Sequence, residues 1–462
     1  MKKTDLKKND IVTLEIEDIT NLGFGVGKIN GAVVFVSSCV PGDVAEVRII
    51  KAASSYYVGR VEKMLVLSDK RCDTRCGSDK CHSCALRLLR YEDELLYKEN
   101  VIRSAFLKER LSDISVLPTV PSPRLTGYRN KAQYPVAKNK TGEYMIGFYA
   151  PKSHNVCEAA HCPMAPDIFA DILEHLRSFF KAYNISVYNE KSGDGILRHV
   201  YLRRAEVSGE VLLVLVLNGD SIPHSDELVA SVRAAFPEIC GILINVNSED
   251  TNVILGDEYI TLYGKDYIVD ELAGVSLKIT APAFYQVNCG TADLIYREAR
   301  RLAGLTKSDT LLDLYCGAGS IGLSMAADAK EVIGIEIVDS AVECARYNAE
   351  QNGITNAEFY TGDAGGAETL LRSAEEKRGK KIKPDVVIFD PPRAGCSQDL
   401  IDYVVRLAPR KIVYISCNPT TLARDVRIMR EKGYTTDTVQ GYDMFPLTGH
   451  VESLVCLQKQ TN

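Results

Sequence analysis

Apolar and polar positions follow three successive patterns along this chain, and the first predicts a small β-barrel. Residues 1–63 hold short apolar runs at 11–16, 32–36 and 44–50, separated by glycines and by a Pro-Gly-Asp turn at 41–43. Runs of this length bounded by turn residues are typical of strands joined by tight loops. We therefore expect an OB-like β-barrel, a fold that often binds nucleic acid through its strand faces and loops.

The second pattern, over residues 64–275, is mixed and predicts an α+β domain. Strand-like apolar runs cover 211–217 and 241–246, and a helix is expected from Pro166, a favoured first helical residue, to about residue 182. An earlier helix is indicated by apolar residues at three- to four-residue and near-heptad steps, a stripe that we interpret as core packing. Its members are Leu88, Leu89, Leu95, Leu96, Ile102 and Phe106.

From residue 276 to residue 462 the pattern changes to strands that alternate with helical segments. Apolar strands are expected at 311–315, 332–335, 386–389 and 411–415. Such alternation predicts a doubly wound, mainly parallel sheet of Rossmann-like topology. The predicted fold class is therefore α/β, with three domains at 1–63, 64–275 and 276–462.

Length and composition agree with a globular chain of about three domains. The chain has 462 residues and 46% apolar content. No stretch approaches the roughly 20 apolar residues that span a bilayer, and the charged start has no signal-peptide core, so we expect a cytoplasmic protein without membrane contact. A net charge of −6 argues against a surface that binds polyanions everywhere but leaves room for a local basic groove.

A glycine-rich turn follows the first strand of the alternating region. Gly317, Gly319 and Gly322 form a G-x-G-x-x-G pattern between an apolar strand and a helix, and Glu336 follows the next strand. Glycines there permit a tight turn and close approach of a ligand, while an acidic residue at this distance can accept ribose hydroxyls. This spacing fits both NAD and S-adenosylmethionine.

Polar residues also follow the other predicted strands of this region. Asp363, Asp390 and Cys417 each stand directly after an apolar run, as Glu336 does. Open α/β sheets bind ligands along the carboxyl ends of their strands, so we expect these side chains to line one cleft with Gly317. Cys417 is then placed on a turn beside the cleft, where a thiolate can act as a nucleophile.

Five motifs in the second half of the chain together resemble the RNA 5-methyluridine methyltransferases. They are FYQVN at 284–288, DLYCGAG at 313–319, DPPRAG at 390–395, SCNPTTLARD at 416–425 and FPLTGHVE at 445–452. The resemblance covers nearly the whole chain, and the N-terminal barrel is similar to the TRAM domain that accompanies the enzymes of this family acting on 23S ribosomal RNA. It implies S-adenosyl-L-methionine as the methyl donor, with cofactor contacts from Gln286, Tyr315, Ser320, Glu336, Asp363 and Asp390.

The chemistry of the uracil ring explains why such an enzyme needs a thiol. Uracil C5 is too weakly nucleophilic to take a methyl group unaided, and addition of Cys417 to C6 gives C5 the carbanion character it needs. A base must then remove the C5 proton, a role that the resemblance assigns to Glu452. Because the target atom lies in the base ring, the uridine must be unstacked, which favours single-stranded or loop RNA over duplex.

Cysteines in the first half of the chain indicate a metal site. Fourteen cysteines are many for a protein of a reducing compartment, and Cys72, Cys76, Cys81 and Cys84 are closely spaced, with Cys162 further along. The spacing excludes a radical S-adenosylmethionine motif and leaves zinc, a 4Fe-4S cluster or reduced thiols without metal. The resemblance favours a 4Fe-4S cluster, although its spacing departs from the family pattern. The expected ligands are Cys76, Cys81, Cys84 and Cys162, with Cys72 competing for the place of Cys76.

The sequence thus predicts a methyltransferase that forms 5-methyluridine in 23S ribosomal RNA, with no evident obligate protein partner. The same residues would serve a variant that acts on the T loop of transfer RNA. A non-catalytic RNA-binding or iron-sulfur protein is the alternative from another class, and Cys417 with Glu452 argues against it. Cytosine-C5 methylation also begins with addition of a thiolate to the base, and it is the lowest-ranked of these hypotheses.

Overall fold

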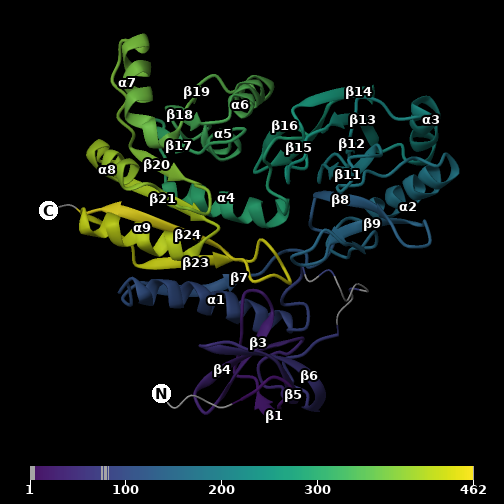
Figure 1. Cartoon of the computed structure of the whole chain (residues 1–462). Coiled ribbons are helices and arrows are strands. Elements are labelled where there is room, and N and C mark those ends of the chain that lie inside the picture. Colours follow the sequence, from purple (N-terminus) through teal and green to yellow (C-terminus); the bar gives the residue numbers. More distant parts are fainter. Residues whose placement is uncertain (1–5, 74–75, 77–80, 82, 461–462) are drawn as a thin grey trace.

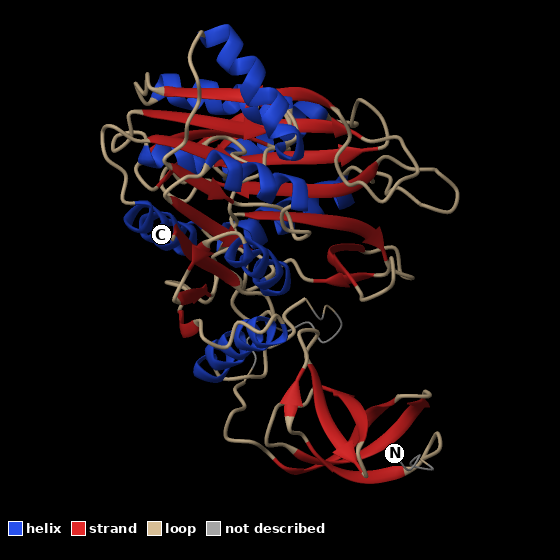
Figure 2. Ribbon diagram, turned by 90° about the vertical axis from the view of Figure 1, so that its left-hand side faces the viewer, coloured by secondary structure: helices blue, strands red, loops and turns tan. Residues whose placement is uncertain are grey.

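The computed structural model describes residues 6–73, 76, 81 and 83–460, which form a barrel, a central domain and a C-terminal domain (Figure 1). The C-terminal domain carries the predicted reactive residues, and we call it the catalytic domain for that reason. The two larger domains lie side by side, and the barrel projects from their lower end (Figures 1 and 2). Within the described ranges, no helix is long and apolar enough to cross a membrane.

The N-terminal strands form a six-stranded sheet that curves into a barrel, as the apolar runs predict. Alternate residues of the longer strands are buried, so Val34 and Val36 enter the barrel core from the same face of one strand. The sheet order is β1-β5-β6-β4-β3-β2. The strands are β1 (Ile11–Glu15), β2 (Asp18–Ile19), β3 (Phe24–Ile29), β4 (Ala32–Ser37), β5 (Val44–Ala52) and β6 (Tyr56–Val66).

The first helix, α1 (Tyr91–Lys108), differs from the expected leucine-lined helix. It begins after Leu88 and Leu89, and Leu96 is 51% exposed, so the predicted stripe is only partly correct. The buried face includes Glu94 and Lys98, which lie one turn apart, together with the apolar residues near the end of the helix. This helix lies between the barrel and the catalytic sheet (Figure 1).

The central domain is a seven-stranded sheet with helices on one face. Its order is β10-β9-β8-β11-β12-β13-β14, and every residue of β12 is buried because the catalytic domain packs against the face that the helices leave open. Its elements are β8 (Lys131–Lys138), β9 (Tyr144–Tyr149), β10 (Val156–Glu158), α2 (Asp167–Ala182), β11 (Leu197–Arg204), β12 (Val211–Leu217), α3 (Ser225–Ala235), β13 (Ile239–Val246) and β14 (Glu258–Gly264).

The catalytic domain contains the predicted doubly wound sheet. A hairpin, β15 (Tyr267–Leu272) and β16 (Val275–Thr280), leads into it, and strands β19, β18, β17, β20 and β21 run parallel in that order. Its elements are α4 (Cys289–Ala303), β17 (Thr310–Leu314), α5 (Ser320–Met325), β18 (Glu331–Glu336), α6 (Asp339–Gln351), β19 (Ala357–Thr361), η1 (Ala364–Gly366), α7 (Ala367–Arg378), β20 (Val386–Phe389), α8 (Gln398–Leu407), β21 (Lys411–Ser416), α9 (Pro419–Glu431), β22 (Tyr434–Thr435), β23 (Thr438–Tyr442) and β24 (Glu452–Lys459).

One edge of this sheet is completed by a strand from far upstream in the sequence. β7 (Ser115–Val120) follows α1 and pairs in parallel with β23, with Ser115 opposite Thr438. Ion pairs between α1 or its following turn and α9, Glu109 with Arg427 and Asp113 with Arg430, add contacts at the surface. The α1-β7 segment is therefore built into the catalytic domain, although it precedes the central domain in the chain.

Candidate active site

Strand pairing brings Cys417 and Glu452 to the same place. β21 and β24 are antiparallel, and Ser416 lies opposite Ser453 in their ladder. Cys417 follows Ser416 at the end of β21, and Glu452 precedes Ser453 at the start of β24. Both residues therefore lie at the carboxyl end of the parallel sheet. Two residues that are 35 positions apart in the sequence thus become neighbours through the strand register.

Burial changes the acidity of both groups. Glu452 is 6% exposed, and burial, followed by the charge of Asp390, raises the pKa of its carboxyl to about 8, while Arg393 opposes the change. Burial also raises the pKa of the half-buried Cys417 thiol, with Glu452 as the next cause. A buried carboxyl with a pKa near neutrality is suited to accept a proton, because both of its charge states are accessible.

The Asp390 motif is fixed to the Cys417 turn by backbone contacts. Asp390 follows β20, the parallel neighbour of β21, and burial raises the pKa of its carboxyl to about 7. The carbonyl oxygen of Arg393 accepts hydrogen bonds from Asn418 Nδ2 at 3.0 Å and from Thr421 Oγ1 at 3.3 Å. Asn418 also caps α9, so the turn that carries Cys417 is held from both sides.

A narrow cavity beside the glycine turn brings together four of the six predicted cofactor residues: Gln286, Tyr315, Ser320 and Asp390. Tyr315 has a φ of 67°, a left-handed backbone that non-glycine residues rarely adopt, and it starts the turn that Gly317 and Gly319 continue. The strained backbone of Tyr315 therefore lies in the wall of the cavity.

The remaining two predicted residues lie beyond this cavity, at the ends of neighbouring strands. Glu336 accepts a hydrogen bond from the backbone N–H of Gly317 at 3.1 Å and another from Val338 at 2.9 Å. Asp363 is exposed and accepts the N–H of Gly365 at 3.1 Å. Five of the six residues therefore follow the carboxyl ends of β19, β18, β17 and β20, and Gln286 reaches the cavity from the segment before α4.

Two further residues of this cleft are not among the six predicted cofactor residues. Tyr296 of α4 lines the cavity, and its hydroxyl lies 3.2 Å from Ser320 Oγ. Asp313 is fully buried under the turn, where it accepts the N–H of Gly322 at 2.9 Å. The helical pattern around Tyr296 indicates only a core position, whereas Asp313 carries a signal of its own, since an acidic residue inside an apolar strand requires a hydrogen-bond partner.

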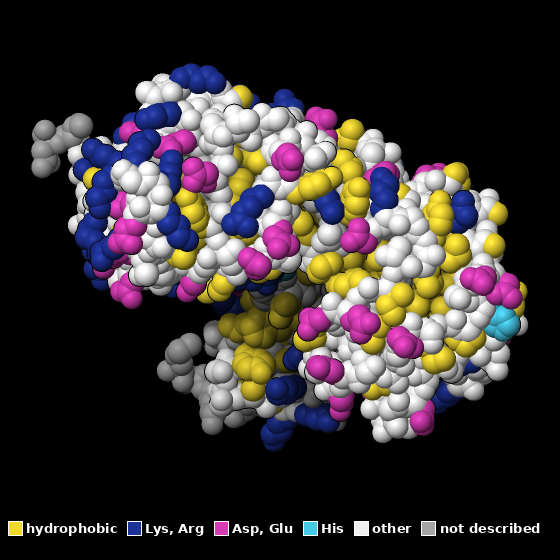
Figure 3. All heavy atoms as spheres, turned by 90° about the horizontal axis from the view of Figure 1, so that it is seen from above, with side chains coloured by type: hydrophobic (Ala, Val, Ile, Leu, Met, Phe, Trp, Pro, Cys, Tyr) yellow, Lys and Arg dark blue, Asp and Glu magenta, His cyan; other side chains and the backbone are white. Residues whose placement is uncertain are grey.

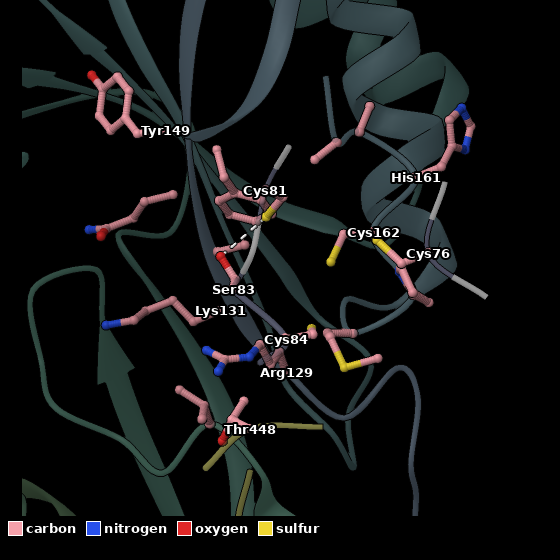
Figure 4. Close-up of a pocket in the computed structure, with 18 of the residues that line it drawn as sticks. Cys76, Cys81, Ser83, Cys84, Arg129, Lys131, Tyr149, His161, Cys162 and Thr448 are labelled. Carbon is pink, nitrogen blue, oxygen red and sulfur yellow. Dashed lines mark hydrogen bonds between the residues drawn. The ribbon is translucent and has the colours of Figure 1, made fainter. Parts of the chain in front are cut away.

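Four of the predicted thiols line a separate cavity of about 760 Å³ between the central and catalytic domains (Figure 4). Cys76, Cys81, Cys84 and Cys162 all contribute to its wall. Burial raises the pKa of the Cys84 thiol to about 12, and the nearby thiol of Cys162 is the next cause. The other residues between Cys76 and Ser83 lie outside the described part of the chain, apart from Cys81.

Cys72, the competing ligand, points elsewhere. Its Sγ donates to the carbonyl oxygens of Leu89 at 3.2 Å and Arg87 at 3.5 Å, and it is not part of the cavity wall. Cys76, and not Cys72, therefore shares the cavity wall with the other three thiols. Among the described residues, however, no three Cys, His, Asp or Glu side chains are grouped as they would be around a bound metal ion.

The outer surface carries charges of both signs. On the face seen from above, Lys and Arg side chains gather over the catalytic lobe and are interspersed with Asp and Glu (Figure 3). On the barrel, Lys28 pairs with Glu17 and Arg60 pairs with Glu62. The side chains of Lys28 and Arg60 are exposed to solvent. The surface in this view has no uniform basic coat, which agrees with the net charge of −6.

Comparison with known proteins agrees with this geometry. A model of the tRNA (uracil-5-)-methyltransferase family matches residues 227–460, and a model of the TRAM domain matches residues 6–61. Relatives described as uncharacterized RNA methyltransferases include those of Clostridium acetobutylicum and Listeria innocua, each 38% identical over 99% of this chain and 99% of their own.

A solved structure is similar over nearly the full length. The tRNA (uracil-54, C5)-methyltransferase of Pyrococcus abyssi, in complex with S-adenosyl-L-homocysteine, superimposes with a TM-score of 0.76 and 26% sequence identity. The match covers 96% of this chain and 100% of the archaeal one, so it extends beyond the catalytic sheet to the other domains.

Proposed function

The chain belongs to the tRNA (uracil-5-)-methyltransferase family, and from this premise we propose that it methylates C5 of a uridine in 23S ribosomal RNA to give 5-methyluridine. The observation that carries the proposal is the adjacency of Cys417 and Glu452 at the carboxyl end of the sheet. A nucleophile and a base side by side are what a reaction needs when it both forms and resolves a covalent adduct with one base.

In the proposed reaction Cys417 Sγ forms a bond to uracil C6, and the electron pair of the C5–C6 double bond moves toward the O4 carbonyl. S-adenosyl-L-methionine, when bound, supplies the electrophilic methyl group that C5 attacks. Glu452 then takes the C5 proton, and the returning electron pair expels Cys417 from C6. The thiol of Cys417 has a raised pKa, so it must lose its proton before or during addition.

The cofactor is assigned to the edge of the sheet that carries the six predicted residues. Gln286, Tyr315, Ser320 and Asp390 would hold the part nearest the reacting methyl group, since they line one cavity and Asp390 among them is close enough to Cys417 for its charge to raise the pKa of that thiol. Glu336 and Asp363 would accept hydrogen bonds from the nucleoside hydroxyls and base edge further along the same edge. The exposure of Asp363 and the place of Glu336 at the end of β18 support that division.

Transfer RNA is the second candidate substrate, and a specific observation favours it. The Pyrococcus abyssi enzyme acts on uridine 54 of transfer RNA, and its match covers 96% of this chain, which includes most of the barrel. The barrel therefore does not by itself separate the two RNAs. Either substrate would place the enzyme in the cytoplasm and would have to present the uridine unstacked.

The test is transfer of label from S-adenosyl-L-methionine to unmodified 23S ribosomal RNA or transfer RNA, followed by nucleoside analysis. Label in 5-methyluridine of 23S RNA supports the first proposal, and label in transfer RNA supports the second. Label in 5-methylcytidine, or in neither RNA, would contradict both and would favour cytosine methylation or the binding-protein alternative, respectively.

We further propose that Cys76, Cys81, Cys84 and Cys162 hold a 4Fe-4S cluster. Four thiols around one cavity are the donor set that such a cluster takes, and zinc accepts the same set. The cluster would tie the loop before α1 to the central domain. Anaerobic purification with iron, acid-labile sulfide and zinc analysis distinguishes the metals, and a protein free of all three would contradict the assignment.

A further inference from the structure

The loop that carries the chain into Glu452 is held by a buried charged group from α1. Lys98 Nζ donates to Asp443 Oδ1 at 2.5 Å, to Glu94 Oε1 at 2.6 Å and to the carbonyl oxygen of Phe445 at 3.1 Å. The side chains of Lys98, Glu94 and Asp443 are all 0% exposed. Three charged side chains are thus buried together at the start of residues 443–451, which we call the base loop.

The same loop is fixed at its middle. Glu94 Oε1, besides binding Lys98, accepts the backbone N–H of Leu447 at 2.7 Å. The Tyr128 hydroxyl donates to the carbonyl oxygen of Pro446 at 3.1 Å. The backbone N–H of Leu86 donates to the carbonyl oxygen of Leu447 at 2.9 Å. Leu447 has a φ of 66°, so these contacts hold it in a backbone conformation that a free loop would rarely adopt.

The neighbouring catalytic helix adds contacts of its own. Thr291 Oγ1 donates to the carbonyl oxygen of Asp443 at 3.2 Å, and Asn288 Nδ2 donates to that of Met444 at 3.0 Å. Asn288 closes the FYQVN motif, so one end of the loop is connected to the predicted cofactor cleft. Lys98 is the group that connects the start of the loop with its middle, because it binds Asp443 directly and Leu447 through Glu94.

A charged group at this position is not explained by stability alone. Burying an ammonium and two carboxylates costs solvation energy that their attraction only partly returns, and apolar side chains of similar volume often stabilise a core as well or better. What a buried charged network supplies is a single arrangement, since removing one member leaves an unpaired charge. Here the arrangement that it fixes leads within a few residues to the proposed base.

We propose that Lys98 is a positioning residue for Glu452. Its contacts hold the base loop so that the Glu452 carboxyl faces the target carbon, and without them the adduct forms but its proton is removed slowly. The proposal rests on the proposed function, because it requires a covalent adduct that Glu452 resolves. It assigns a role in the reaction to a helix that lies outside residues 227–460, the part matched by the family model.

The test compares Lys98→Met with the parent enzyme in turnover and in denaturing gels of enzyme with RNA. We expect kcat to fall on the order of 10²-fold, as a displacement of about 1 Å in a reacting group can cause, while the KM for S-adenosyl-L-methionine changes little. A denaturation-resistant RNA-protein complex should accumulate. A purely structural defect would lower the amount of active enzyme and would not enrich this complex.

Two further variants separate positioning from folding. Tyr128→Phe removes a hydroxyl and leaves the buried charges intact, so it should fold and accumulate a smaller amount of the complex. Arg427→Met removes the partly exposed ion pair between Arg427 and Glu109, whose atoms are 2.8 Å apart. This ion pair lies at the other end of α1, away from the base loop. The Arg427→Met variant should turn over like the parent without accumulating the complex.

Each outcome decides the proposal. Accumulated complex in Lys98→Met and Tyr128→Phe, but not in Arg427→Met, supports it. Two results would overturn it, provided that the Glu452→Gln variant still traps RNA. One is normal turnover by both Lys98→Met and Tyr128→Phe, and the other is lost turnover by these variants without accumulation of the complex. If Glu452→Gln traps nothing although its fold is intact, the role of Glu452 is wrong, and the positioning role of Lys98 fails with it.

Discussion

The catalytic edge and the cysteine cavity are both built around thiols, but the chain specifies them in different ways. Cys417 follows a buried strand of a parallel sheet, and its partner Glu452 starts the strand paired with it. The four cavity thiols come from the loop before α1 and from the segment before α2. The position of a residue at a strand end is set by the sheet, whereas the position of a loop thiol depends on the packing of two domains.

Electrostatics separates the two regions further. Burial is the largest cause that raises the pKa of the Cys417 thiol, the charges of Glu452 and Asp390 raise it further, and Arg393 lowers it. In the cavity, burial of Cys84 and the charges of other thiols raise its pKa to about 12. Thiols that raise one another's pKa bind protons or metal ions, while a lone thiol beside a base can react with a substrate. The comparison predicts that the two regions respond differently to the same substitution.

The largest effect is expected at Cys417. Cys417→Ala should reduce methylation on the order of 10⁴-fold or more, because no other group can activate C5, and it should form no covalent RNA complex. Radiolabel transfer and denaturing gels measure both. Cys344→Ala, which removes a half-buried thiol on α6, is the matched control and should retain activity. Undiminished methylation by Cys417→Ala would refute the nucleophile assignment.

Replacement of the base should be the next largest effect. Glu452→Gln keeps the size of the side chain and removes its ability to take a proton, so multiple turnover should fall by roughly 10²- to 10⁴-fold. Methyl transfer to the RNA should still occur once per enzyme molecule. Single-turnover assays that show neither methylated RNA nor a stable complex, with the fold intact by circular dichroism, would count against Glu452 as the base.

The pH profile provides a smaller effect with a defined sign. Glu452 must be ionised to accept the proton, and its pKa is raised to about 8, so the parent rate should rise steeply from about pH 6 to pH 8 and level off only above pH 8. The raised pKa of Cys417 acts in the same direction, because only the thiolate adds to C6. The pH dependence of covalent complex formation by Glu452→Gln reports the ionisation of Cys417 alone, because this variant lacks the Glu452 carboxyl. A parent rate that falls over this range would contradict both assignments.

The smallest effect on the reaction is expected in the cysteine cavity. Cys162→Ala should lose iron and melt at a lower temperature, since one donor of the proposed cluster is gone, while each folded molecule still forms the covalent complex. Cys72→Ala is the control, because Cys72 bonds to backbone carbonyls and lies outside the cavity wall. Equal iron content in both variants and the parent would show that these thiols do not hold the metal.

The sequence predicted well what depends on periodicity and poorly what depends on packing across the chain. The strands before Glu336, Asp390 and Cys417 are found within one or two residues of their expected places, because each apolar run is buried on both sides. The partnership of Cys417 with Glu452 came from the family resemblance, since an antiparallel register cannot be read from two separate runs.

Other features of the site carried no readable signal. β7 looks like any short apolar run, and only the structure shows that it pairs with β23 more than 300 positions later, Ser115 with Thr438. Glu94 and Lys98 are four residues apart, a spacing typical of ion pairs on the exposed face of a helix. The apolar pattern, in contrast, predicts Leu96 as a core residue. The burial of Lys98 comes from the base loop that packs on α1, whereas Leu96 is 51% exposed.

The most direct test of the account is to identify the residue of the Glu452→Gln enzyme that becomes bound to RNA. The protein is incubated with S-adenosyl-L-methionine and unmodified RNA, digested with protease and nuclease, and analysed by tandem mass spectrometry. We predict a methylated uridine attached to Cys417 and to no other cysteine. Attachment at a different residue, or full methylation of the RNA with no attached nucleotide at any stage of the reaction, would contradict the mechanism.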